Sequence, residues 1–227
     1  MARRKPEEAA ETRRAILASA RELFTEHGFA ATATTDVVAR AGVTRGALYH
    51  HFADKTDLFR AVFIDLEQEL NDTVLAAAAA GGDDARAVFL AGCRASMVFA
   101  GRPDYRQIAT VDAPAVLGQD EWHALDVSLG LASMVAGLDL LHAAGRLDQV
   151  PDRPLAILLF GALTEAALAA ARGEAEADEL FAAFERLIDR FSPADAAEPA
   201  APAEPAAPAM PADLPEPTDP ADRAPSA

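Results

Sequence analysis

The chain has 227 residues, 51% of them hydrophobic, which is enough to bury the core of one or two domains. The formal net charge is −16 but unevenly distributed: residues 1–60 carry ten Lys and Arg against eight Asp and Glu, a net of +2, and the remaining residues carry −18. DNA repels so acidic a protein as a whole. The composition therefore excludes a nonspecific nucleic-acid binder, but it allows a small sequence-reading head on an acidic body.

The cysteine content, the N-terminal residues and the longest apolar run favour a cytoplasmic protein. Cys93 is the single cysteine, which excludes an intramolecular disulfide, and we expect a buried structural thiol and not a redox sensor. The basic residues 3–5 are followed by proline and glutamate and not by the apolar core of a signal peptide. The longest apolar run, residues 155–171, is interrupted by Gly161 and Glu165, so it predicts a buried helix and no membrane partner.

The N-terminal part predicts a short basic arm followed by a helix. Residues 1–10 form the arm, which either touches DNA or is simply a solvated terminus. Residues 11–27 have helical apolar spacing, with Ile16 and Phe24 on one face, and Gly28 ends this helix. We assign residues 11–57 to a three-helix domain with its own small core, near the lower size limit for independent folding.

Residues 32–52 predict two short helices joined by a tight turn. Thr32 can cap the first helix, Gly42 supplies the backbone freedom of its C-terminal cap, and Thr44 can cap the second. Two helices joined by a turn of about three or four residues that contains Gly form a helix-turn-helix, whose second helix fits the DNA major groove. The alternative is an ordinary helical hairpin with a solvated polar face, which leaves the helix-weakening Gly46 unexplained.

The polar side of the second helix has side chains that suit nucleic acid. Arg45 can bind guanine through two hydrogen bonds, and Thr44 can reach a base or a phosphate from the helix N-terminus. Ala47 can touch a thymine methyl group. Tyr49 and His50 can donate to phosphate oxygens, which sets the register of the protein on DNA without reading sequence.

The segment GVTRGALYHHFADKTDLF, which starts at Gly42, resembles the DNA-binding domain of the TetR/AcrR repressors, and the resemblance covers about residues 11–66. It implies a two-fold dimer that binds a palindromic operator and leaves it when a small molecule enters the second domain. It also implies a phosphate contact for Lys55, which would resolve the conflict of a cation at a helix N-terminus. The DNA contacts predicted in this way are Thr32, Thr34, Thr44, Arg45, Gly46, Ala47, Tyr49, His50 and Lys55.

Beyond the head the apolar spacing is helical throughout, so we expect an all-α fold of about nine helices. A long amphipathic helix that starts at Leu58 links the head to the second domain. We assign residues 58–192 to a ligand-binding and dimerisation domain. The last two helices carry more apolar surface than one subunit is expected to cover, which predicts an intermolecular four-helix bundle through Leu155, Leu159, Leu163, Leu180, Phe184 and Ile188.

Residues 193–227 have a different composition from the rest of the chain. They hold ten of the fifteen prolines, thirteen alanines and seven acidic residues against a single base, Arg223. Such a segment cannot bury enough apolar surface to offset the entropy of ordering it. We therefore predict a disordered acidic tail.

No constellation of residues indicates catalysis. His50 and His51 point about 100° apart on a helix and cannot share a metal ion, so we expect no catalytic residues, no metal site and no cofactor. The resemblance implies a ligand pocket in the second domain, although Met and aromatic residues at helical spacing are more often plain core. The candidate pocket residues are Phe89, Cys93, Met97, Tyr105, Trp122, His123, Met134, Leu138, His142 and Phe160.

These features together predict a homodimeric transcriptional repressor that a small-molecule effector releases from a double-stranded DNA operator. The alternative is a cytosolic helical enzyme or small-molecule carrier whose helix-turn-helix is vestigial. The net charge of the head and the polar set on its second helix argue against this alternative.

Overall fold

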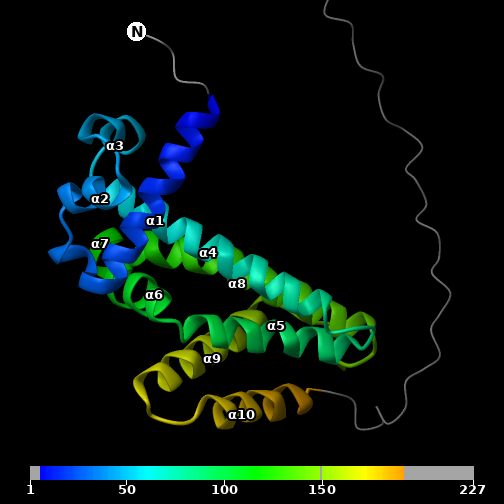
Figure 1. Ribbon diagram of the computed structural model, residues 1–227. Helices are drawn as coiled ribbons and strands as arrows, with labels where there is room; N and C mark the ends of the chain where they lie inside the picture. The colour runs from blue at the N-terminus through cyan, green and yellow to red at the C-terminus, as the bar shows by residue number, and fades with distance from the viewer. Residues whose placement is uncertain (1–5, 149, 192–227) are drawn as a thin grey trace, which may run out of the picture. The chain divides into compact units, whose positions relative to one another are not determined.

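The computed structural model describes residues 6–148 and 150–191, and in these residues it contains helices and no strands (Figure 1). The all-α prediction is confirmed. The basic arm up to residue 5 and the acidic tail lie outside the described residues. The nine helical segments of the described residues are α1 (Pro6–Ala31), α2 (Thr34–Ala41), α3 (Arg45–His51), α4 (Lys55–Ala79), α5 (Ala85–Ala100), the continuous run of α6 (Pro103–Tyr105), η1 (Arg106–Asp112) and α7 (Ala113–Leu117), α8 (Gln119–Ala143), α9 (Arg153–Arg172) and α10 (Ala177–Asp189).

Local sequence signals fix most of the helix boundaries. Thr44 Oγ1 accepts a hydrogen bond from Ala47 N at 3.1 Å, so this predicted cap of α3 is confirmed, and Asp54 Oδ1 caps α4 in the same way by accepting one from Asp57 N at 2.8 Å. α1 starts earlier than expected, and Gly28 kinks it instead of ending it, because the backbone there has a positive φ of 75° before the helix resumes to Ala31.

The first of two hydrophobic cores joins the head to the rest of the protein. Phe24 of α1 and Phe59 of α4 pack edge to face with ring centroids 5.2 Å apart. The same core continues into Leu66 of α4, Phe99 of α5 and Ile108 of η1, all of which are buried. Residues 11–57 therefore share their core with the second domain, and the expectation of a separate core for the head is wrong.

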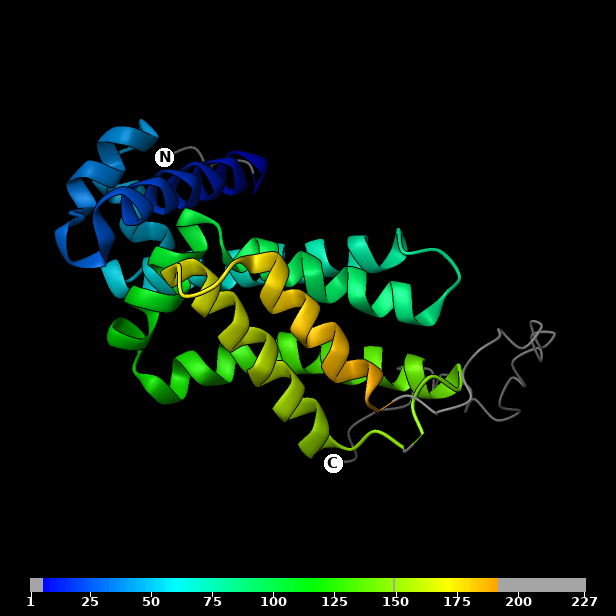
Figure 2. The same cartoon turned by 90° about the horizontal axis from the view of Figure 1, so that it is seen from below.

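The second core is formed by α5, α8, α9 and α10, which pack against one another, with α9 and α10 side by side (Figure 1 and Figure 2). It buries Leu159, Leu163, Phe184 and Ile188 within one subunit, so these residues are not available to a partner, and this part of the predicted dimer interface is wrong. The prediction that one subunit leaves much of the apolar surface of α9 uncovered underestimated how much of it α5, α8 and α10 cover. The two other predicted interface residues, Leu155 and Leu180, are partly buried against the same core.

In the part of the chain that the structure describes, two helices have the length and apolar composition that could cross a membrane: α8 (Gln119–Ala143) and α9 (Arg153–Arg172). The apolar run of residues 155–171, for which the sequence predicts a buried helix, lies within α9. In α9 one side of the helix faces the second core through Ala156, Leu159, Leu163 and Ala167, and the polar interruptions fall on other sides. A helix of this kind is typical of a protein interior, and its length and apolar composition alone do not indicate a membrane span.

Candidate DNA-binding face and ligand cavity

Helix α3 separates its side chains cleanly into a buried and an exposed side. Leu48 is fully buried in the first core, and Thr44, Arg45, Gly46, Tyr49 and His50 are exposed. Five of the predicted contact residues thus lie on the exposed side of this helix, which we call the α3 face. A short helix with one such polar face, anchored by a core on the other side, has the geometry needed to enter a major groove.

Tyr49 connects the α3 face to the start of α2. Its hydroxyl lies 3.5 Å from Thr34 Oγ1, and the Arg45 guanidinium lies 5.5 Å from the centre of its ring. The hydrogen bond with Thr34, followed by that with Arg45, lowers the pKa of Tyr49 below its ordinary value. Thr34, Arg45 and Tyr49 therefore form one polar cluster across the two helices.

Two predicted contacts do not reach this face. Ala47 is only 8% exposed and packs into the core, so its methyl group cannot touch a base. Thr32 is 2% exposed, and its hydroxyl lies 2.8 Å from Gly28 O and 3.1 Å from Leu23 O. It closes the kink of α1 and does not cap α2, whose N-terminus has no side-chain cap.

Lys55 is held inside the head. Its ammonium group donates to Phe29 O at 2.9 Å and to Thr32 O at 3.0 Å, and it lies 4.1 Å from the centre of the Phe29 ring. Two of the three N–H donors are thus used to tie the α1–α2 connection to the start of α4. These contacts account for a lysine at a helix N-terminus even when no DNA is bound. The phosphate contact of Lys55 stays a prediction, and it would use the third N–H donor.

Removing the Lys55 amine should destabilise the head. Lys55→Met keeps most of the aliphatic stem over Phe29 and removes the two hydrogen bonds, so we expect the free energy of unfolding to fall by about 1–3 kcal/mol. Urea denaturation measures this loss, and Lys55→Arg, which keeps the charge, should lose less. An unchanged unfolding midpoint for Lys55→Met would show that these bonds do not stabilise the head, and Lys55 would then be primarily a candidate for DNA contact.

A cavity of about 1060 Å³ lies between α4, α5, η1, α8 and α9. Its volume is at the upper end of the range for pockets that hold drug-sized molecules. Close approach of Phe89 to α8 shapes one wall: a Cβ atom at Gly137 would lie only 2.5 Å from Phe89 Cδ2. Six of the predicted pocket residues line the cavity, namely Phe89, Cys93, Tyr105, Trp122, Met134 and Phe160.

The other four predicted pocket residues lie elsewhere. Met97 and Leu138 are buried in the second core beside the cavity, and His123 is exposed. His142 is placed at the end of α8, where its Nδ1 lies 3.1 Å from Leu147 O. A helical wheel cannot separate residues that line a cavity from those that pack behind it, because both are apolar and on the same side of the helix.

Cys93 behaves as a structural residue. Burial raises the pKa of its thiol to about 12, so the thiol remains protonated at neutral pH and is a poor nucleophile. It contributes to the cavity wall as a small apolar group.

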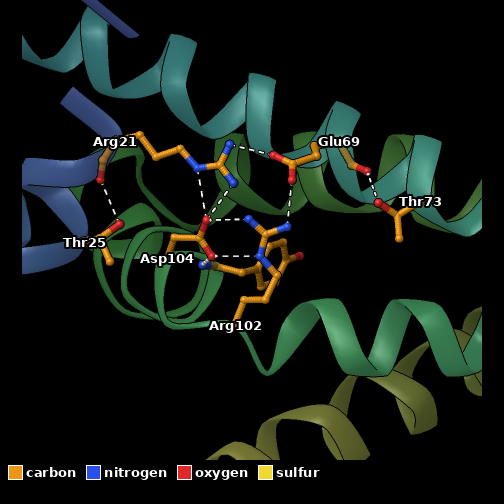
Figure 3. A network of polar contacts seen from close by, with 7 residues as sticks. Arg21, Thr25, Glu69, Thr73, Arg102 and Asp104 are labelled. Carbon is orange, nitrogen blue, oxygen red and sulfur yellow. Dashed lines mark hydrogen bonds and ion pairs between the residues drawn. The ribbon is translucent and has the colours of Figure 1, made fainter. Parts of the chain in front are cut away.

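A four-residue ion-pair cluster links the head to the second domain (Figure 3). Arg21 of α1 donates to Glu69 of α4 at 2.6 Å and to Asp104 of α6 at 2.6 Å. Arg102, just before α6, donates to the same two carboxylates at 2.7 and 2.8 Å. Burial alone would raise the pKa of Glu69 and of Asp104, but the hydrogen bonds from the two arginines outweigh it and lower both pKa values. The cluster therefore stays charged at neutral pH.

The α6–η1 segment lies between the head and the cavity. At one end Asp104 binds Arg21, and at the other end Asp112 accepts a hydrogen bond from Phe29 N at 2.8 Å, at the kink of α1. Between these ends, Gln107 lines the cavity. Trp122, also on the cavity wall, donates to the carbonyl oxygen of Ala109 in η1 at 3.0 Å. The same short segment thus contacts both the cavity and α1.

Two family models match this chain. One, "Bacterial regulatory proteins, tetR family", matches residues 16–62, and the other, "Tetracyclin repressor-like, C-terminal domain", matches residues 86–191. A solved structure described as a TetR-family transcriptional regulator from Pectobacterium atrosepticum is 34% identical, with a TM-score of 0.70, over 87% of this chain and 100% of that one. The chain belongs to the TetR family. A second TetR-family structure, from Rhodococcus, has a TM-score of 0.67 at 19% identity over 81% of this chain and supports the fold alone.

Curated relatives of this TetR-family chain match it mainly in the head. The HTH-type transcriptional repressor BepR of Brucella suis is 50% identical over 60 residues, 26% of this chain and 29% of that protein. The HTH-type transcriptional regulator AcrR of Shigella flexneri is 43% identical over 75 residues, 33% of this chain and 35% of that protein. The match therefore spans only about a third of the length of these relatives and carries no information about their ligands.

The sequence reasoning missed the polar lining of the cavity in this TetR-family protein. The clearest example is Glu67, which is 4% exposed and follows Phe63 by one helical turn on the buried side of α4. Asn71, one turn further on, accepts a hydrogen bond from Ser133 of α8 at 3.0 Å. A carboxylate and an amide on the otherwise apolar side of a long helix were the signals that could have identified this wall.

Proposed function

We propose that this TetR-family protein is a DNA-binding transcriptional regulator, a repressor that works as a homodimer in the cytoplasm and is released from a palindromic operator by a small molecule. The observation that supports it most directly is the α3 face, a polar surface that includes Arg45 on a helix anchored by the first core. No observation favours the alternative of an enzyme or carrier, and the absence of catalytic residues and of a cofactor stays an expectation.

Selection of bound sequences from random DNA by the purified protein tests this proposal. A dimer with one α3 face in each subunit should enrich a palindrome whose half-sites are about one helical turn apart, or a multiple of it. Recovery of an asymmetric site, or of no preferred sequence, would contradict it. Footprinting on genomic DNA would then identify the regulated genes.

Arg45 is proposed to read base sequence. Arg45→Ala should weaken operator binding by about 1–3 kcal/mol and remove the base preference at one position in each half-site. His50→Ala is the matched comparison on the same face, and it should weaken all sequences alike because a phosphate contact carries no sequence information. Fluorescence anisotropy with operators varied one base pair at a time measures both effects. Equal losses on every sequence for both variants would mean that Arg45 contacts phosphate.

We propose a dimer contact on the outer side of α9 and α10 that differs from the predicted one. Ile157 and Leu158 of α9 and Leu187 of α10 are among the exposed large apolar residues of the described chain. Gly161, one turn beyond Ile157, has open space around it, which would let a second helix approach closely. A two-fold contact through this surface would cover apolar groups that the subunit leaves exposed.

Release from DNA requires that the ligand distinguish two arrangements of the head. The α6–η1 segment is suited to this task, since Gln107 and Tyr105 line the cavity while Asp104 and Asp112 hold α1. A molecule that displaces the η1 wall would move these two carboxylates relative to Arg21 and Phe29. The head would turn with them, and the two α3 faces of the dimer would lose the spacing that matches the operator.

A further inference from the structure

We infer that two glycines of α8, Gly130 and Gly137, set the size of the molecule that the cavity accepts. They give the rings of Phe160 and Phe89 room against α8, so that these rings stay out of the cavity. The inference rests on the proposed function in treating the cavity as the effector site, and it adds the residues that select an effector by its size.

Each of these glycines lies against one aromatic ring from a neighbouring helix. A Cβ atom at Gly137 would lie 2.5 Å from Cδ2 and 2.9 Å from Cε2 of Phe89 on α5. A Cβ atom at Gly130 would overlap Cε2 of Phe160 on α9 and would lie 2.8 Å from its Cζ. Ordinary contacts between carbon atoms are about 3.5–4.0 Å long. Any residue other than Gly would therefore displace the ring that it meets.

The two glycines share the side of α8 that faces the cavity. Gly weakens the interior of a helix, so its use twice in α8 needs a structural reason. The two positions are seven residues apart, which is close to two helical turns, and both line the cavity together with Met134 between them. Glycines elsewhere in these helices lack such a contact, since a Cβ atom at Gly161 of α9 would meet nothing. The reason for the glycines of α8 is thus the room that the two rings need.

A methyl group at either position would push a ring into the cavity. Phe89 is 5% exposed and belongs to the second core, and Phe160 packs against that core. Protein cores are packed as densely as organic crystals, so they offer no space for a displaced ring. Both rings also line the cavity of about 1060 Å³, which is the free volume beside them. A ring that moves off α8 therefore narrows the cavity.

Two neutral probes of different size test the inference. Nile red is a rigid dye of four fused rings that fluoresces in apolar surroundings, and naphthalene is a rigid molecule of two. Titration calorimetry gives the affinity of the full-length protein for both probes. Trp122 is the single tryptophan of the chain and lies on the cavity wall, so quenching of its fluorescence shows that a probe occupies this cavity.

Gly137→Ala should weaken Nile red at least about fivefold and change naphthalene less than about twofold. Gly130→Ala should have the same effect through Phe160. Gly92→Ala on α5 is the matched comparison, because it adds the same methyl group, and its nearest neighbour, Val74 Cγ1, would lie 3.4 Å away, close to an ordinary contact. This variant should weaken Nile red less than about twofold.

A double variant separates the proposed role from a general disturbance of α8. Valine has no atoms at the Cδ2 and Cε2 positions of Phe89, so it leaves room for a methyl group at Gly137. In the Phe89→Val protein, Gly137→Ala should therefore change the affinity for Nile red less than about twofold. A crystal structure of Gly137→Ala should show the ring of Phe89 turned into the cavity.

Equal affinities of the wild type and Gly137→Ala for Nile red, or an equal loss for both probes, would overturn the inference. A ring displaced away from the cavity would do the same, as would a wild-type protein that does not bind Nile red at all. If Gly137→Ala does not fold, as judged by its melting curve, Gly130→Ala makes the same comparison. Failure of both to fold would contradict the inference, because the rings would then have no free volume to enter.

Operator anisotropy separates this result from the proposed function. A protein that binds no operator but shows the size effect would sustain the inference and contradict the proposed function. A protein that binds its operator while Gly137→Ala accepts both probes as the wild type does would sustain the proposed function and contradict the inference.

Discussion

Leu158→Glu should convert the protein from a dimer to a monomer and weaken binding to the full palindromic operator by about 10²–10⁴-fold, because the second half-site contact is then no longer intramolecular. Leu158 is 70% exposed on α9, so a Glu side chain can be accommodated in the free subunit. In a two-fold contact the new carboxylate would lie near its own copy or against apolar groups, and both placements are unfavourable. Sedimentation at micromolar concentration measures the assembly, and anisotropy measures the affinity for the operator.

Val98→Glu is the matched control for this experiment. Val98 is 66% exposed on α5 and lies outside the proposed contact, so the same change in charge should leave the dimer intact. A dimeric Leu158→Glu protein that binds the operator normally would show that the subunits associate through another surface. A Leu158→Glu protein that is monomeric and still folded would show that the dimer forms through the outer side of α9 and not through its buried side.

Phe184→Ala should lower the free energy of unfolding by about 3–5 kcal/mol, because it leaves a cavity inside the second core of each subunit. Phe184 is 4% exposed and stacks on Phe181 with ring centroids 6.3 Å apart. Its removal should detach α10 from α5 and α9, which pack on the same core. Urea denaturation at several protein concentrations measures the loss and separates it from the stability contributed by association.

Leu187→Ala provides the comparison on the same helix. Leu187 is exposed, so its truncation should cost less than about 1 kcal/mol of unfolding free energy in the subunit. If Phe184→Ala unfolded at the same urea concentration as the wild type but failed to dimerise, Phe184 would belong to the interface after all, as the apolar pattern of the last two helices first indicated.

The elements of this protein were largely predictable because their signals are local. Thr44 caps α3 through a hydrogen bond to a residue three positions away, and Gly42 takes the left-handed conformation that ends α2. The exposed polar face of α3 follows from the same short-range periodicity. A cap, a glycine and an apolar stripe act within one or two turns of helix, so they can be read from the sequence without knowledge of what packs against them.

The roles of Thr32, Ala47 and Lys55 were not predictable in this way. Each has a side chain compatible with DNA contact, but each is used inside the head: the Thr32 hydroxyl bonds to Gly28 O and Leu23 O, Ala47 is buried, and Lys55 donates to the distant Phe29 O and Thr32 O. The polar wall of the cavity was missed for a related reason. Glu67 reads as one more acid on a long amphipathic helix, and its burial depends on helices from distant parts of the chain, such as α5 and α8, that pack against α4.

Short-range patterns along the chain are enough to establish that this protein is all-α, where its helix-turn-helix lies and which polar residues of α3 face outward, because these properties depend on neighbours within a few residues. The tertiary structure alone decided which side of α9 and α10 is free, which apolar residues enclose a cavity and that Arg21, Glu69, Arg102 and Asp104 meet in one cluster. Apolar residues are interchangeable in a sequence pattern. Whether each one faces a neighbouring helix, a cavity or solvent is set by contacts between segments that are far apart along the chain.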